Sequence, residues 1–429
     1  MQEDFHYYAT YCAAYIAGYS HEESMDICYS AQFVDLCTRT YLAGIRAPLS
    51  AATTQLQLEL AESGADPISL QDMTRIWASF HFLPRDLKAE PDRKCAKRYK
   101  NKYRLICGPN GDLLIDTVNL AKGRTLQAAG LAMHVLADTW AHRYFAGTPS
   151  LAINNTYKYF FEYRPEDGEI VEARIKFNHN PGSIDDIVNS HYTNSVHQNN
   201  ENSIMNLGHG RAGHLPDYSW AIYRYMPAWG DYKVIIKDNP LDYTYAFTQM
   251  IYALKYLRGV ESEFKTDTYD VAAISMYKDE IRDIITKRQL DACADWKAFG
   301  ERLSGCVIDE FDIDRYREEY ISAKDSEKDN TFLGRFIIAA MAQKSMVTNR
   351  IFKSGNKLAG YSIDYETKGL GGIRDYFRLL KKNTEFEIND MAEDVSAFAE
   401  ETAEALACLE EDIMEKDSAE NNSGGKSKK

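Results

Sequence analysis

The sequence contains 8 cysteines, but no two of them are spaced as Cys-x-x-Cys, and it has no long run of apolar residues. Closely spaced cysteine pairs are typical of thiolate zinc sites and redox motifs, so we predict that most of these cysteines are free thiols or buried apolar side chains. No apolar run approaches the roughly 18 residues of a membrane-spanning helix. The first residues also lack the basic start and apolar stretch of a signal peptide. We therefore expect a soluble, cytoplasmic protein without a transmembrane segment.

Positive charge is also scarce, since 50 Lys and Arg residues face 64 Asp and Glu residues and the formal net charge is −14. A surface of this sign does not grip nucleic-acid phosphates non-specifically, so we expect no stable nucleic-acid binding. A local basic pocket, or bound metal ions, could still attract a phosphate group. The charge balance argues against a chromatin-type binder and leaves a phosphodiesterase open.

Several motifs of known enzyme classes are absent. The dipeptide His-Asp does not occur, and the single His-Glu lacks the second histidine of the zinc-protease motif. There is no phosphate-binding Walker loop and no Gly-x-Ser-x-Gly elbow. The dinucleotide-binding motif is matched by the residue types of Gly208-x-Gly210-x-x-Gly213. The structural context of that motif is missing, because no strand-like run precedes it and Pro216 follows where a helix should continue. These absences argue against the common nucleotide-binding and serine-hydrolase folds.

Prolines (11) and glycines (25) are few, which permits long helices. Apolar residues recur at three- and four-residue spacing through much of the chain, as in amphipathic helices. Residues 151–215 differ, because clusters of Asn, Gly and Pro indicate loops and an alternating run at 170–177 indicates a small hairpin. We therefore expect a mainly all-α fold. Its predicted parts are a metal-binding helical domain at 1–260 with an insertion at about 151–215, a helical C-terminal region at 261–416, and a disordered tail at 417–429.

One strongly apolar helix is predicted from about Thr117 to Phe145, and it carries three polar side chains on one face. His134, Asp138 and His142 follow one another at intervals of four residues, so each turns by only about 40° from the last on a helix of 3.6 residues per turn. A buried carboxylate between two imidazoles is unfavourable unless its charge is compensated. Neutral His nitrogens and Asp oxygens are ordinary zinc ligands. The alternative is a hydrogen-bonded His–Asp–His stack without metal.

Further candidate ligands are scattered along the chain, several of them where a predicted helix begins or ends. Together with His134, Asp138 and His142 they form a set of nitrogen and oxygen ligands without a thiolate. Such a set suits a catalytic rather than a structural zinc site. Three other histidines, His179, His191 and His197, lie in the polar middle section, and we predict that they are surface residues, although one of them could be an additional ligand. The additional candidates are His6, Asp35, His81, His209, His214 and Asp217.

In their order along the chain these residues resemble the ligands of the zinc-dependent phospholipase C and S1–P1 nuclease superfamily. More closely, four segments look like an uncharacterised bacterial family related to that superfamily. The likeness covers roughly residues 1–260. The segments are Asp4-Phe5-His6, Phe80-His81-Phe82-Leu83-Pro84, Asp138-Thr139-Trp140-Ala141-His142, and Gly208-His209-Gly210 with Pro216-Asp217.

The resemblance implies a helical domain that binds two or three zinc ions, or another divalent metal. It implies Asp35 and Asp138 as catalytic residues, with Asp138 bridging two ions. In two places the spacing differs from the superfamily: only three residues separate Asp138 from His142, and His209 lies eight positions before Asp217. The implied ligands are His6 with main-chain groups of Met1 for one ion, Asp35, His81 and His134 for a second, and His142, His209 and Asp217 for a third, with His214 as a lesser candidate.

The function that follows is hydrolysis of a phosphoester or phosphodiester by metal-activated water, with the class of substrate left open. Two alternatives remain. The first is a non-catalytic binding protein that keeps the metal as scaffold or sensor and uses its C-terminal helices as a surface for a protein partner. The second is a carboxylate-bridged iron site, which the scarcity of Glu-x-x-His pairs disfavours.

Overall fold

The computed structural model describes residues 1–56, 58–60, 67–87, 104–148, 151–156, 159–166, 169–179, 183–194, 207–230 and 233–356. The part of the predicted helical C-terminal region after residue 356, the predicted tail at 417–429 and His197 lie outside the described residues. None of the described helices is long and apolar enough to cross a membrane.

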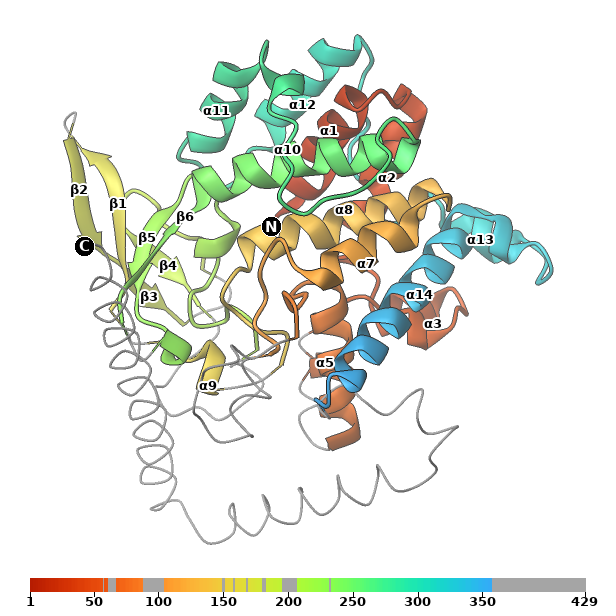
Figure 1. The fold of residues 1–429 in the computed structure, drawn as a ribbon, viewed down its shortest axis with the longest axis horizontal. Helices are drawn as coiled ribbons and strands as arrows, with labels where there is room; N and C mark the ends of the chain where they lie inside the picture. Colours follow the sequence, from red (N-terminus) through yellow and green to blue (C-terminus); the bar gives the residue numbers. More distant parts are fainter. Residues whose placement is uncertain are drawn as a thin grey trace, which may run out of the picture.

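The helical part of the molecule is built around α8 (Leu126–Ala141), whose side chains are almost all buried. It packs against α2 (His21–Phe33), α7 (Asp112–Ala121), α10 (Asn239–Arg258) and α14 (Phe332–Lys353) (Figure 1). Thr125 begins α8 by accepting a hydrogen bond from Ala128 N, so the helix has a regular N-cap. The single helix predicted from Thr117 to Phe145 is wrong, because the chain breaks between α7 and α8 at Gly123, where φ is +68°.

The remaining helices lie around α8 and the four helices packed against it (Figure 1). The chain starts with a π-helical turn, Asp4–Ala9, which continues directly into α1 (Thr10–Ile16). A capping box formed by Ser20 and Glu23 begins α2. The other helices are α3 (Arg39–Gly44), α5 (Pro67–Phe80), α9 (Leu151–Asn154), α11 (Lys278–Thr286), α12 (Cys293–Ser304) and α13 (Arg317–Ser322).

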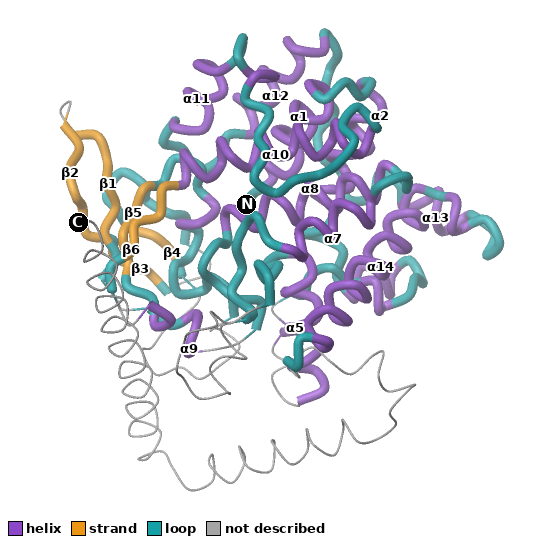
Figure 2. The backbone as a smooth tube through the Cα atoms, viewed as in Figure 1, coloured by secondary structure: helices purple, strands orange, loops and turns teal. Residues whose placement is uncertain are grey.

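The expectation of an all-α fold is wrong, because the described residues also form two β-sheets. An antiparallel sheet has the strand order β2-β1-β5-β6, and a parallel pair joins β3 to β4. Figure 2 shows the strands gathered on one side of the molecule, beside the helical part. The fold is therefore mixed. The strands are β1 (Phe161–Glu166), β2 (Glu169–Arg174), β3 (Lys176–Asn178), β4 (His191–Thr193), β5 (Ile222–Tyr225) and β6 (Ile235–Asp238).

Two apolar cores are present among the described residues, one in the helical part and one beside the sheets. The larger core takes residues from both sides of position 260, including Phe5, Leu136, Trp296 and Phe336, so the helices after α10 pack into the same core as α8. The smaller core lies beneath the sheets and contains Phe82 and a group of tyrosines, phenylalanines and Trp220. Both cores reach the segment around Phe80–Phe82, where α5 ends.

Candidate metal centre

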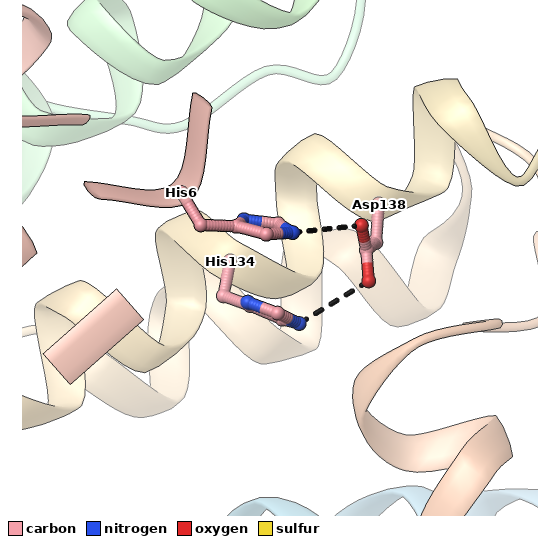
Figure 3. Close-up of side chains that lie close together, drawn as sticks. All are labelled: His6, His134 and Asp138. Carbon is pink, nitrogen blue, oxygen red and sulfur yellow. Dashed lines mark ion pairs between the residues drawn. The ribbon is translucent and has the colours of Figure 1, made fainter. Parts of the chain in front are cut away.

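Helix α8 presents His134 and Asp138 on one face, and the π-helical turn at the start of the chain brings His6 opposite them (Figure 3). His6 Nε2 lies 3.1 Å from Asp138 Oδ1, and His134 Nε2 lies 3.2 Å from Asp138 Oδ2. The two imidazole rings stack with their centroids 3.8 Å apart. We call His6, His134 and Asp138 the His6 group; their ligand atoms lie within 4.8 Å of one another.

A second set of ligand atoms within 4.8 Å of one another, the Asp35 group, consists of Asp35, His81 and His134. Asp35 follows the end of α2, and His81 follows the end of α5, so each side chain comes from a turn rather than from a helix. His81 Nδ1 lies 3.7 Å from Asp35 Oδ1, 3.3 Å from His134 Nε2 and 3.3 Å from Asp138 Oδ2. Since His134 belongs to both groups, the two sets are immediate neighbours.

The third set, the Asp217 group, consists of His142, His209 and Asp217. His142 is the C-cap of α8, and Asp217 ends the 3-10 turn Leu215–Asp217. His142 Nε2 lies 3.2 Å from Asp217 Oδ1, and His209 Nε2 lies 3.7 Å from Asp217 Oδ2. His214 is not part of this group: its side chain is 57% exposed, and its Nδ1 lies 3.5 Å from Asp217 Oδ2.

The amino group of Met1 lies between the His6 group and the Asp217 group. Its nitrogen is 2.9 Å from Asp138 Oδ1, 3.2 Å from Asp217 Oδ1 and 3.3 Å from His142 Nε2. Burial alone would lower the pKa of this amine, but the carboxylates of Asp138 and Asp217 raise it to about 11. A positive charge is therefore stabilised at this position.

Backbone carbonyl groups fix which nitrogen of three imidazoles carries the proton. A carbonyl oxygen only accepts, so the ring nitrogen that faces it must donate. His81 Nε2 donates to Thr53 O (3.0 Å), His142 Nδ1 donates to His81 O (2.7 Å), and His209 Nδ1 donates to Gly213 O (2.7 Å). Carbonyl partners of this kind orient metal-bound histidines in proteins. The other nitrogen of each ring then points a lone pair into the centre.

These lone pairs face carboxylate oxygens, which also carry lone pairs. His81 Nδ1 faces both Asp138 Oδ2 and Asp35 Oδ1, and His209 Nε2 faces Asp217 Oδ2. Two acceptors at such distances repel each other unless a proton or a metal ion lies between them. In addition, the side chain of His6 is fully buried, yet its Nδ1 has no hydrogen-bond partner among the described residues, and its Nε2 has only the ion-pair contact with Asp138. The residues present therefore fit divalent cations.

The electrostatics of the centre favour neutral imidazoles and ionised carboxylates, the forms that bind metal. Burial lowers the pKa of His6 and of His134 to about 4, and that of His209 likewise to about 4. Burial alone would raise the pKa of Asp138, but the imidazole of His142 and the Met1 amine hold it well below its usual range. Asp35 differs, because burial raises the pKa of its carboxyl group.

The centre is closed on most sides. His6, His134 and Asp138 are at most 1% exposed, whereas the side chain of Asp35 is 29% exposed and that of His209 is 20% exposed. The ring of Phe82 packs beside the centre, stacked on His142 with the centroids 4.7 Å apart and tilted against His209 at 5.8 Å. Asp35 and His209 are therefore the least buried members of the three groups.

The structure brings together eight of the side chains that the sequence singled out as ligands. His179 and His191 are exposed and take no part, and His214 stays at the rim. Sequence reasoning missed the carbonyl groups of Thr53, His81 and Gly213, because no residue pattern marks a backbone acceptor. The eight side chains are His6, Asp35, His81, His134, Asp138, His142, His209 and Asp217.

Comparison with known proteins gives a match at the level of a family. No curated protein and no solved structure matches the chain. One family profile does match, and the matched region, residues 1–351, includes every side chain of the three groups. The chain therefore belongs to the family of unknown function DUF6765.

Proposed function

We propose that the protein is a metal-dependent hydrolase, with zinc as the metal, that cleaves phosphoester or phosphodiester bonds. The observation that carries this proposal is the convergence of imidazole lone pairs on carboxylate oxygens at His81 and His209. The ligand set contains nitrogen and oxygen atoms but no thiolate, which suits a catalytic site for zinc. The resemblance to the phospholipase C and S1–P1 nuclease superfamily supports the same reaction class.

Divalent ions held in the three groups would supply a water of lowered pKa and positive charge to stabilise the phosphoryl oxygens. The chain's own residues would do the rest. Asp138 offers one carboxylate oxygen to His6 and the other to His134, so it fixes the His6 and Asp35 groups relative to each other. Asp35 is the most exposed carboxylate of the three groups, and it would accept a proton from the attacking water.

The charge of the centre favours an anionic substrate. The three groups contain three carboxylates, from Asp35, Asp138 and Asp217, and burial favours the neutral imidazole at His6, His134 and His209. Two or three divalent ions would then exceed the negative charge of these carboxylates. A phosphate ester approaching the Asp35 edge would meet positive charge, although the chain as a whole carries −14.

The test combines metal content with catalysis. We expect purified protein prepared without chelator to contain at least one equivalent of zinc and to release nitrophenol from bis-nitrophenyl phosphate. His134→Ala and Asp138→Asn should each lower the rate by about 100-fold or more, because they remove direct ligands. His191→Ala, an exposed histidine of β4, is the matched control and should keep full activity. Activity that survives both ligand substitutions would contradict the proposal.

A non-catalytic metal-stabilised binding protein is the second candidate, and one observation favours it. Most ligands are nearly inaccessible, with His6, His134 and Asp138 at most 1% exposed, as in structural metal sites. The same experiment separates the two functions. Metal bound at one or more equivalents, with no hydrolysis of any phosphoester tested, would favour the binding protein.

A further inference from the structure

Thr53 lies outside the three groups, but it makes three hydrogen bonds to the segments that carry Asp35 and His81. Its carbonyl oxygen accepts from His81 Nε2 at 3.0 Å. Its hydroxyl donates to Val34 O at 2.6 Å, and its amide donates to Cys37 O at 3.0 Å. Thr53 is fully buried, so all three bonds form away from water.

Asp35 needs such a support because it is not part of a helix. Helix α2 ends at Phe33, and the chain turns through residues 34–37 before α3 begins. Val34 and Cys37 flank Asp35 on either side, and Thr53 bonds to the carbonyl groups of both. The position of the Asp35 carboxylate relative to His81 Nδ1, 3.7 Å away, is therefore set through one residue.

Helix α14 holds the same segment from the other side. Lys344 Nζ donates to Ala52 O at 2.9 Å, immediately before Thr53. The neighbouring Gln343 donates to Ser79 O at 3.2 Å, two residues before His81. Both contacts reach the backbone beside a candidate ligand from a helix that lies more than 200 positions later in the chain.

We infer that Thr53, held by Lys344 of α14, is a positioning residue that joins Asp35 to His81 and sets the Nε2–H form of His81 in the Asp35 group. This inference rests on the proposed metal centre. It follows that residues outside the ligand set hold the Asp35 group in place. The affinity of this group for an ion then depends on the contacts that α14 makes. Loss of such partners commonly weakens metal binding by about 10- to 100-fold.

The test measures zinc affinity by competition with a chromophoric chelator, and the absorption spectrum of the Co²⁺-loaded protein, which reports ligand geometry. Thr53→Val keeps the shape of the side chain but removes the hydroxyl donor to Val34 O. We expect it to weaken binding of one ion by about 10- to 100-fold and to change the Co²⁺ spectrum. Thr53→Ser restores the hydroxyl and should restore both properties.

The matched control is Thr248→Val in α10. Thr248 is 1% exposed and its hydroxyl donates to Thr244 O at 2.9 Å, so the substitution removes a comparable buried hydrogen bond away from the candidate ligands. It should lower thermal stability without changing zinc affinity or the Co²⁺ spectrum. Lys344→Met removes the bond to Ala52 O without touching Thr53, and it should also weaken binding. It serves as the test if Thr53→Val does not fold.

The outcomes separate this inference from the proposed function. If the wild-type protein binds no metal, the metal centre itself is wrong and the inference falls with it. If the wild type binds metal and Thr53→Val and Lys344→Met bind it with unchanged affinity and spectrum, only the positioning role is wrong. Equal losses of affinity in Thr53→Val and Thr248→Val would also overturn it, because the effect would then be one of general stability.

Discussion

At the scale of single residues, the candidate centre is defined by imidazoles that stay neutral inside the protein. Burial places the pKa of His6, His134 and His209 at about 4, against about 6.5 for a histidine in water. Neutral imidazoles bind cations without first releasing a proton, so the centre is ready to take up metal at neutral and mildly acidic pH. The same burial makes the metal-free protein sensitive to acid.

We predict that the free energy of unfolding of the metal-free protein rises as the pH is raised from about 4 to about 6.5. In this window the unfolded chain binds protons on histidines that the folded chain keeps neutral, so protonation favours unfolding. Each such histidine contributes a slope of about 1.4 kcal/mol per pH unit. Urea unfolding in chelator across this range measures it.

His134→Gln should reduce this slope, because it removes one of the histidines that stay neutral in the folded chain. The exposed His191→Gln should leave it unchanged. A slope that is identical in wild type and His134→Gln would show that His134 is not held neutral by burial.

Residue spacing predicted part of this centre and could not predict the rest. His134 and Asp138 lie four residues apart on a helix, so their proximity follows from helix geometry alone. His209 and Asp217 are eight positions apart in a segment of turns, and only the 3-10 turn at Leu215–Asp217 brings them within 3.7 Å. Asp35 meets His81 through Thr53, a contact for which the sequence carries no pattern.

At the scale of elements, the centre depends on how closely α2 approaches α8. Gly130 lies in α8 where a Cβ atom would come within 2.2 Å of Ile27 O and 2.7 Å of Ser30 Cβ, both in α2. Only glycine permits this distance between the two helices. Asp35 follows the end of α2, and His134 lies one turn after Gly130 in α8. The close approach of the two helices therefore also sets the distance between these two candidate ligands.

We predict that Gly130→Ala separates α2 from α8 and lowers the free energy of unfolding by about 1–3 kcal/mol, the usual effect of overpacking a core. Zinc affinity should fall as well, because Asp35 moves with α2. Chemical denaturation and chelator competition measure the two effects.

Gly44→Ala provides the comparison. Gly44 ends α3, and a Cβ atom at this position would meet nothing within 4 Å among the described residues. Alanine should therefore be neutral there or stabilise the fold by about 0.5–1 kcal/mol. A Gly130→Ala protein as stable as the wild type would contradict the close-packing argument.

The sheets show where element-level prediction failed. Residues 151–215 are rich in Asn, Gly and Pro, which correctly indicated turns and an alternating hairpin-like run, since β2 covers Glu169–Arg174. The parallel pair of β3 and β4 in the same region was not predicted, and neither were β5 and β6 in the next segment. In β5 only Tyr223 and Tyr225 point inward, over four residues, and β6 is equally short. Strands of this length carry too little alternation to be told from loops.

At the scale of the whole molecule, the candidate centre lies where the two apolar cores meet. The larger core carries α8 and reaches Ile351, while the smaller core lies under the sheets and includes Phe82, whose ring stacks on His142. The ligands come from segments between residues 6 and 217, and α14 supports one of them through Lys344. Ions bound here would therefore hold distant parts of the chain together.

Removal of metal should consequently lower the stability of the whole fold rather than of one segment. An ion that binds only the folded state adds about 2.7 kcal/mol when its free concentration is 100 times Kd. We expect zinc to raise the midpoint of thermal unfolding, and chelator to lower it, with Trp and far-ultraviolet signals moving together. In Asp138→Asn the difference in unfolding midpoint between zinc and chelator should be much smaller, because Asp138 contacts both His6 and His134. His191→Ala should retain it. If zinc shifts the unfolding of Asp138→Asn as much as that of the wild type, the ions that stabilise the fold bind somewhere other than this centre.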